Sequence, residues 1–440
     1  MRNTKQLISK LFGIVGVRLL AIALTFLQTL TLVKVFGADV FGQYSFVISI
    51  ASILIVLLSM GVDQLMMRHL AQAGDGATGQ PKWIAYKKIT FRIVVPAVCS
   101  VVFFGLILAF KTQLIAEYKI PFVVMLCALP LLIARKYFES ILLGLKKVLL
   151  SIVSSQVVFP LILISASGLV SVSTFPTSSL VLMLIYWSAS ALSLVMCIIL
   201  CLPALKKLGL GATENSEASS IGYGEYCRSG LHLSFLSLGI IIGQHIDVLM
   251  MGVVGQPEDV ALVRIAARMA EIVGLMRTIV LLQYRPMIAS SFGQSDFRQL
   301  QRYTKIMVSL FLVGGLPIAI AMWIWSSSIL LYFDPAFAGN DWVVRFYLLG
   351  ILAMLIMGPT NAVLSMCDRE SVASKNLLQS LGVKVILNLI LMPFLGALGC
   401  AISSFVSLVF LGFLGRAGVR KALNLETSIL VYFKNSDEKY

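Results

Sequence analysis

The chain has 440 residues, of which 59% are hydrophobic and only 12% are charged, and its mean hydropathy is +0.94. A typical soluble domain is about 45–50% apolar and about 25% charged, so this composition excludes a soluble enzyme, a disordered protein and a secreted module. The net charge is +15, an excess that in a membrane protein usually reports orientation. We therefore expect an all-α, polytopic membrane protein that binds no nucleic acid.

Runs of mainly apolar residues recur along the whole chain. A helix needs about 20 such residues to cross the hydrocarbon layer, and twelve runs have this length. Several of them contain proline, including Pro359 in the tenth, which predicts bent helices. The predicted spans are 11–33, 43–66, 90–110, 120–141, 148–170, 179–202, 229–252, 261–283, 305–330, 343–366, 376–395 and 396–415.

Lys and Arg are unequally distributed between the loops that join these spans. If the N-terminus is inside, the inside segments carry 26 of the 35 Lys and Arg residues and the outside loops carry four. Cytoplasmic loops of membrane proteins are enriched in these residues. The alternation predicts twelve spans with both termini cytoplasmic.

The longest segment between spans is polar and rich in Gly and Ser, and it divides the spans into two sets of six. Six spans per half give both halves the same orientation, which is typical of a parallel repeat. The predicted organisation is an N-terminal six-helix lobe (1–203), a cytoplasmic linker (204–228), a C-terminal six-helix lobe (229–415) and a cytoplasmic tail (416–440).

Motifs of catalysis and metal binding are missing from the sequence. It contains no HExxH, P-loop, GxSxG or Cys/His metal spacing, and its seven cysteines form no CxxC pair. The outside loops are short, which argues against a cell-envelope acyl- or glycosyltransferase, the alternative from a different class. We expect no catalytic residue, no metal and no cofactor.

Eight ionisable residues lie within the predicted spans, where each costs on the order of 2.5–3.5 kcal/mol at mid-helix unless it faces a cavity or a partner. On the eighth span, Arg264, Arg268 and Glu271 share one helical face. This face should line an interior and not contact lipid. Pairing inside the protein is one role open to these charges, and the candidate pairs are Asp247–Arg264, Arg268–Glu271 and Arg18–Asp63.

Anion binding is the other role open to the basic residues in the spans. Pairing leaves Arg277 and Lys384 without an obvious partner, and Arg suits bidentate phosphate contacts while Lys acts as a point charge. The predicted substrate-binding residues are Arg18, Arg268, Arg277 and Lys384. Ion coupling or structural pairing is assigned to Asp63, Asp247, Arg264 and Glu271. Coupling to a proton or sodium gradient stays open.

Four stretches give the chain a family resemblance. They read LVKVFGADVFGQYSF, SMGVDQLMMRHLAQ, QHIDVLMMGVVGQPEDVALVRIAARMAE and LMPFLGALGCAISSFVS. With the six-plus-six layout, they resemble bacterial polysaccharide-repeat flippases (O-antigen, capsule or exopolysaccharide) of the multidrug/oligosaccharidyl-lipid/polysaccharide exporter superfamily. One departure from the family pattern is Arg264, which stands where a neutral residue is commoner.

The resemblance implies two six-helix lobes around a central cationic cavity in the bacterial inner membrane. Such proteins move undecaprenyl-pyrophosphate-linked oligosaccharides from the cytoplasmic to the outer leaflet by alternating access. Arg18 and the basic residues of the eighth span would line the cavity, and Asp247 would occupy an acidic position near the end of the seventh helix. The implied partners are the lipid-linked oligosaccharide, the bilayer, and the polysaccharide polymerase and chain-length machinery. Two alternatives within the superfamily remain, a multidrug or cation antiporter and a peptidoglycan lipid-precursor flippase.

Overall fold

The computed structural model describes residues 2–73, 95, 98–103, 105, 118–145, 147–173, 176–207 and 223–432. The elements within these ranges are helices, so the expectation of an all-α polytopic protein is confirmed. The chain divides into two compact units, Met1–Gln244 and His245–Tyr440, and the boundary falls inside one long helix, α9 (Tyr223–Val254). Most of the predicted linker (208–222) lies outside the described residues.

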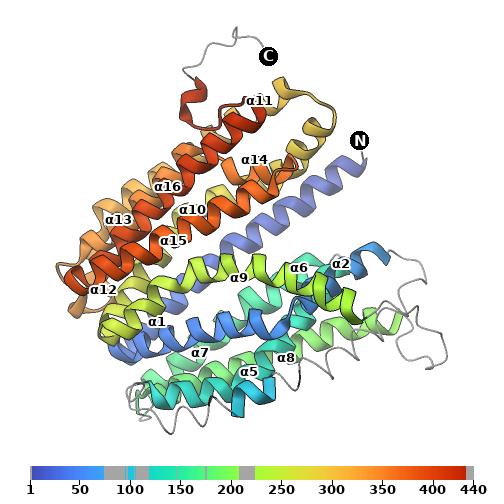
Figure 1. Ribbon diagram of the computed structural model, residues 1–440. Coiled ribbons are helices and arrows are strands. Elements are labelled where there is room, and N and C mark those ends of the chain that lie inside the picture. The colour runs from blue at the N-terminus through green and yellow to red at the C-terminus, as the bar shows by residue number, and fades with distance from the viewer. Residues whose placement is uncertain are drawn as a thin grey trace. The chain divides into compact units, whose positions relative to one another are not determined.

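The first unit contains the helices that correspond to the predicted spans one, two and four to six. The helices α5 and α8 pack side by side, as do α2 and α5, and α1 contacts α7 (Figure 1). The elements are α1 (Arg2–Ser59), α2 (Val62–Ala73), α5 (Lys119–Gly144), α6 (Val148–Ile152), the π-helical turn η3 (Val153–Val158), α7 (Phe159–Val172) and α8 (Ser179–Lys207).

The first predicted span (11–33) and most of the second (43–66) lie in the single long element α1, and the end of the second lies in α2. Gly37 interrupts α1 with φ 84° and ψ 167°, a conformation that glycine adopts readily because it has no Cβ. Eight described helices are long and apolar enough to cross a membrane, or nine if the bent pair α13 (Asp341–Met357) and α14 (Thr360–Met366) counts as one span. The predicted third span, 90–110, lies mainly outside the described residues.

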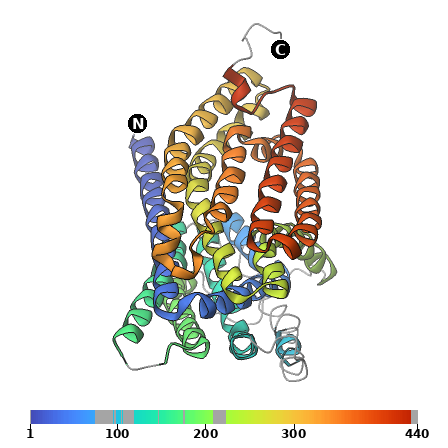
Figure 2. The ribbon, with the colours of Figure 1, turned by 90° about the vertical axis from the view of Figure 1, so that its left-hand side faces the viewer.

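The second unit is built around α16, which packs against both α13 and α15, while α10 packs against α11 and α13 (Figures 1 and 2). Small residues along the buried side of α16, such as Ala397, Gly399 and Ser403, allow this close approach. Besides α13 and α14, the elements of this unit are α10 (Pro257–Gly293), α11 (Phe297–Ile324), α12 (Ser326–Phe333), η4 (Pro335–Phe337), α15 (Glu370–Leu395), α16 (Ala397–Leu423) and η5 (Ile429–Tyr432).

Large apolar side chains cover the outside of the helices. Phe394 is 84% exposed and Val313 is 74% exposed, which would be costly in water because exposed apolar surface is unfavourable there. Lipid contact removes this cost. The chain is therefore a multi-pass membrane protein, as the composition predicts.

The C-terminal end of the chain differs from the prediction in one respect. The helix α16 continues to Leu423, so the first residues of the predicted tail (416–440) are helical. Asn424 then ends the helix with φ 54° and ψ 28°, and residues 424–432 turn back toward the start of α11, which η5 contacts. The short helices α12 and η4, which connect α11 to α13, were not predicted as separate elements.

Candidate functional site

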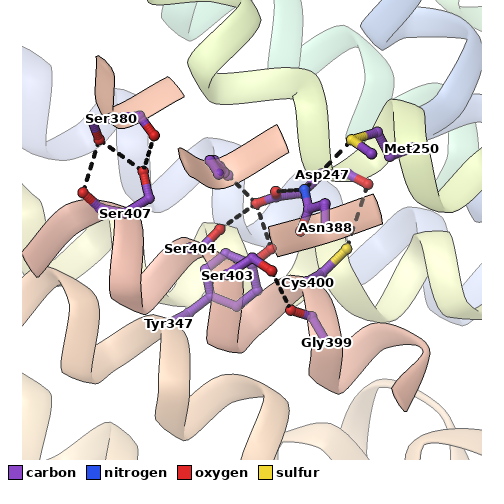
Figure 3. A network of polar contacts seen from close by, with 11 residues as sticks. Asp247, Met250, Tyr347, Ser380, Asn388, Gly399, Cys400, Ser403, Ser404 and Ser407 are labelled. Atoms are coloured by element: carbon purple, nitrogen blue, oxygen red, sulfur yellow. Dashed lines mark hydrogen bonds and ion pairs between the residues drawn. The ribbon is translucent and has the colours of Figure 1, made fainter. Parts of the chain in front are cut away.

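A buried carboxylate, Asp247, organises the polar side chains of the second unit (Figure 3). It lies near the end of α9 and is 5% exposed. Its Oδ2 accepts hydrogen bonds from the Tyr347 hydroxyl at 2.8 Å and the Ser404 hydroxyl at 2.5 Å. Its Oδ1 accepts a hydrogen bond from the Asn388 amide at 3.0 Å. Four helices, α9, α13, α15 and α16, therefore meet at one carboxylate.

The charge of Asp247 is balanced by Lys384. Lys384 Nζ lies 2.8 Å from Asp247 Oδ2, and the lysine is itself only 9% exposed. Lys384 and Asn388 stand one helical turn apart on α15, so both side chains reach the same carboxylate. The pair is neutral as a whole, and its hydrogen bonds satisfy both carboxylate oxygens, which is the condition under which a buried ion pair is tolerated.

The expectation that Lys384 lacks a partner is therefore wrong. The physical reason is that the packing of α9 against α15 brings two in-membrane charges of opposite sign together, and pairing them is cheaper than leaving either alone. Whether Lys384 also contacts a substrate anion stays a prediction. The ammonium lies beside Asp247 Oδ2, the oxygen that Ser404 also contacts, while Asn388 contacts Oδ1.

The acidic and basic residues of α10 are arranged partly as predicted. The pairing of Arg268 with Glu271 is confirmed, since Arg268 Nη1 lies 2.6 Å from Glu271 Oε2. Arg277 is partly buried, and its Nε is buried without a hydrogen-bond partner among the described residues. A buried guanidinium N–H without an acceptor is costly. Binding of a substrate anion by Arg277 stays a prediction. Arg264 is partly buried on the same helix.

Two predicted residues, Arg18 and Asp63, lie in the first unit. Asp63 is 4% exposed, and its Oδ2 lies 3.1 Å from Lys136 Nζ. Lys136 also donates a hydrogen bond of 3.3 Å to the Ser59 hydroxyl. Sequence reasoning paired Asp63 with Arg18, whereas the structure gives it Lys136, on α5. Arg18 is partly buried, and within the part of the chain that the structure describes its buried Nε has no hydrogen-bond partner.

Sequence reasoning missed the neutral side chains that complete the Asp247 site. Tyr347, Asn388 and Ser404 are polar residues within apolar spans, and Asn388 follows Lys384 by four residues. The spacing of Asn388 was a usable signal, because i and i+4 residues share a helical face. Nothing in the sequence indicates that α13 and α16 contribute to the same site. In the searched part of the chain, no group of three or more His, Cys, Asp and Glu residues could hold a metal ion.

Comparisons with known proteins agree with this architecture. A family model described as polysaccharide biosynthesis protein matches residues 7–292, and a second, described as MatE, matches residues 233–394. No curated protein matches the sequence significantly.

Solved structures of transporters have a similar fold. One is an inward-facing multidrug resistance MATE family transporter of the MOP superfamily, at 12% identity and a TM-score of 0.69, covering 92% of this chain and 94% of that one. Another is the lipid II flippase MurJ in an inward closed conformation, at 13% identity and a TM-score of 0.70, covering 92% and 87%. A third is a mutant of the Vibrio cholerae MATE transporter VcmN, at 12% identity and a TM-score of 0.54, covering 98% of both chains.

The family match covers more than half of the chain, and the structural matches span nearly all of it. The chain therefore belongs to the polysaccharide biosynthesis protein family and has the fold of MOP-superfamily transporters, not that of an enzyme.

Proposed function

We propose that this protein moves an undecaprenyl-pyrophosphate-linked oligosaccharide from the cytoplasmic to the outer leaflet of the bacterial plasma membrane, for surface polysaccharide synthesis. The observation that carries the proposal is the polysaccharide biosynthesis family match over residues 7–292. The similarity in fold to a lipid II flippase supports a lipid-linked substrate. O-antigen, capsule and exopolysaccharide repeat units all fit this substrate class.

The physical problem of such transport is the polar headgroup. A pyrophosphate with its sugars cannot cross hydrocarbon unaided, because burying an unpaired charge is very costly. Basic side chains within the spans would provide the missing solvation while the polyprenyl tail stays in lipid. Of the predicted ligands, Arg277 is the best candidate in the second unit, since its Nε is buried and has no hydrogen-bond partner. Arg18 has the same property in the first unit.

Lys384 and Arg268 have different roles in this proposal. Both already face a carboxylate, at 2.8 Å and 2.6 Å respectively, so each would have to exchange that partner for a phosphate. We assign both residues the main role of neutralising these carboxylates, and contact with the substrate is their secondary role. The product would pass to the polysaccharide polymerase and chain-length machinery.

A multidrug or cation antiporter is the main rival, because MATE transporters share the fold. A cationic substrate favours carboxylates that are free to receive it. In the second unit, however, Asp247 faces Lys384 and Glu271 faces Arg268. This pairing favours the anionic substrate. A peptidoglycan-precursor flippase would also carry a pyrophosphate, so the glycan must be identified by experiment.

Deletion of the gene in its native host tests the proposal. We expect undecaprenyl-linked repeat units to accumulate on the cytoplasmic side, with surface polysaccharide lost and cell-wall synthesis continuing. Complementation with the wild-type gene should reverse both effects. Normal surface polysaccharide in the deletion strain, together with increased sensitivity to cationic dyes, would contradict the proposal and support the antiporter.

A further inference from the structure

Beyond its proposed transport function, the second unit contains a bent junction covered by the end of the chain. The helices α13 and α14 meet at an angle of 47° across Gly358 and Pro359. Gly358 has φ 78° and ψ −161°, a conformation that residues with a Cβ rarely adopt. A Cβ at this position would overlap the carbonyl oxygen of Thr427. The C-terminal segment, residues 424–432, thus lies directly against the bend.

The C-terminal segment is held by one carboxylate, that of Glu426. Arg416 on α16 donates two hydrogen bonds of 2.8 Å to it, from Nε to Oε1 and from Nη2 to Oε2. The backbone N–H groups of Thr427 and Ser428 each lie 3.1 Å from Oε1, and the Ser428 hydroxyl lies 2.7 Å from it. Bidentate Arg–carboxylate pairs are among the stronger polar contacts in proteins.

Two further contacts attach the C-terminal segment to α11. The Gln301 side chain donates to the Glu426 carbonyl at 2.8 Å and accepts from the Glu426 N–H at 3.2 Å. The Tyr432 hydroxyl donates to the Lys305 carbonyl at 2.9 Å and also contacts the Ser309 hydroxyl. Leu425 and Thr427 are almost completely buried. The segment therefore bridges α11, α16 and the α13–α14 bend.

Some polar side chains at the bend lack hydrogen-bond partners. The side-chain oxygens Thr360 Oγ1, Asn361 Oδ1 and Thr427 Oγ1 are buried and have no hydrogen-bond partner within the described ranges, which end at residue 432. Unsatisfied buried polar groups are uncommon and costly. The arrangement therefore combines strong contacts at Glu426 with buried, unpaired polar oxygens at the junction beneath it.

We propose that residues 424–432 are a latch that holds the α13–α14 junction in its bent form, and that the junction can change shape only when this segment is released. The strong contacts lie on the segment, while the unpaired polar groups lie at the junction. Release would let the junction oxygens find other partners, and Gly358 has the backbone freedom to change conformation. The latch lies at the end of the second unit that the sequence predicts to be cytoplasmic.

The ionisation of Glu426 sets the pH range over which the latch is stabilised. Burial alone would raise the pKa of Glu426, but hydrogen bonds from Arg416 and Ser428 outweigh burial and lower it from 4.5 to about 2. A carboxyl group whose pKa is lower in the folded state stabilises above its unfolded-state pKa, and this stabilisation is lost as the pH falls through the folded-state pKa. We expect the difference in Tm between wild type and Glu426→Gln to be constant from pH 7 to about 5 and to shrink below about 4.5. An equal difference at pH 7 and at about 3.5 would show that the carboxylate does not hold the segment.

Hydrogen exchange of the full-length protein in lipid nanodiscs tests the latch. Glu426→Gln removes the charge of the carboxylate, and Gly358→Ala adds a Cβ that displaces Thr427. In both variants we expect amides of 424–432 to exchange about tenfold faster or more, and amides of 357–366 to accelerate with them, because linked segments open together. Amides around Lys384 should be unchanged, which separates release of the latch from general unfolding.

Two matched variants serve as controls. Glu370→Gln neutralises an exposed glutamate in the first turn of α15. Gly339→Ala changes a glycine with φ 80° that has open space around its Cβ position, so it shares the backbone cost of Gly358→Ala without the clash. Neither should change exchange at 424–432. If Glu426→Gln fails to fold, Tyr432→Phe removes only the hydroxyl contacts and should give a smaller acceleration of the same peptides. The latch is refuted if the segment exchanges faster while 357–366 stays unchanged, or if the segment itself does not respond.

Discussion

Lys384→Met is expected to lower the free energy of unfolding by about 3–5 kcal/mol, because removing one partner of a buried ion pair leaves an uncompensated charge. Asp247 would keep its hydrogen bonds from Tyr347, Asn388 and Ser404 but lose the ammonium 2.8 Å away. The measurement is thermal or denaturant unfolding of the purified protein.

The double variant Asp247→Asn with Lys384→Met identifies the cause of this loss. It removes both charges, so it should be more stable than Lys384→Met alone, and the coupling energy of the cycle measures the pair. Lys375→Met is the matched control, because Lys375 is exposed on the same helix, α15. Wild-type stability in Lys384→Met, or a double variant no better than the single one, would contradict the assigned pair.

Arg277→Ala is expected to reduce transport by about 10- to 100-fold, since a hydrogen bond to a charged group is worth about 1.5–3 kcal/mol. Protein level and stability should stay near wild type, because Arg277 Nε has no hydrogen-bond partner to lose. Arg277→Lys should keep part of the activity, because lysine supplies a positive point charge but not the bidentate geometry of arginine. Complementation of the deletion strain measures the effect.

Arg298→Ala is the control for Arg277→Ala. Arg298 is exposed in the first turn of α11, so its removal changes the net charge equally without affecting a buried site. Transport should stay at the wild-type level in this variant. If Arg277→Ala transports fully at normal protein levels, Arg277 is not a substrate ligand.

The spans could be predicted from the sequence because apolar length alone decides whether a helix can cross a bilayer. The predicted spans that lie within the described residues are helical over most of their length, although some cross a break between two helices. The breaks and bends within the helices depend on single backbone positions. The break at Gly37 inside α1 and the bend at Gly358 are set by two glycines with positive φ, and glycine frequency alone does not identify them.

The candidate site was only partly predictable, for a different reason. Charges within apolar spans stand out because each is costly, so Asp247 and Lys384 were both identified. The Arg268–Glu271 pair is local, and helical spacing predicts it. The Asp247–Lys384 and Asp63–Lys136 pairs join residues on different helices. Their pairing follows from helix packing, which spacing along the chain does not contain.

Transport by the purified protein in proteoliposomes tests the central claim most directly. The assay would follow a fluorescent undecaprenyl-pyrophosphate-linked oligosaccharide until it becomes accessible to a hydrolase on the opposite side. We predict movement by the wild-type protein and strong reduction in Arg277→Ala, with Arg298→Ala equal to wild type. Failure of the wild-type protein to move this substrate, while it moves a lipophilic cation, would contradict the account.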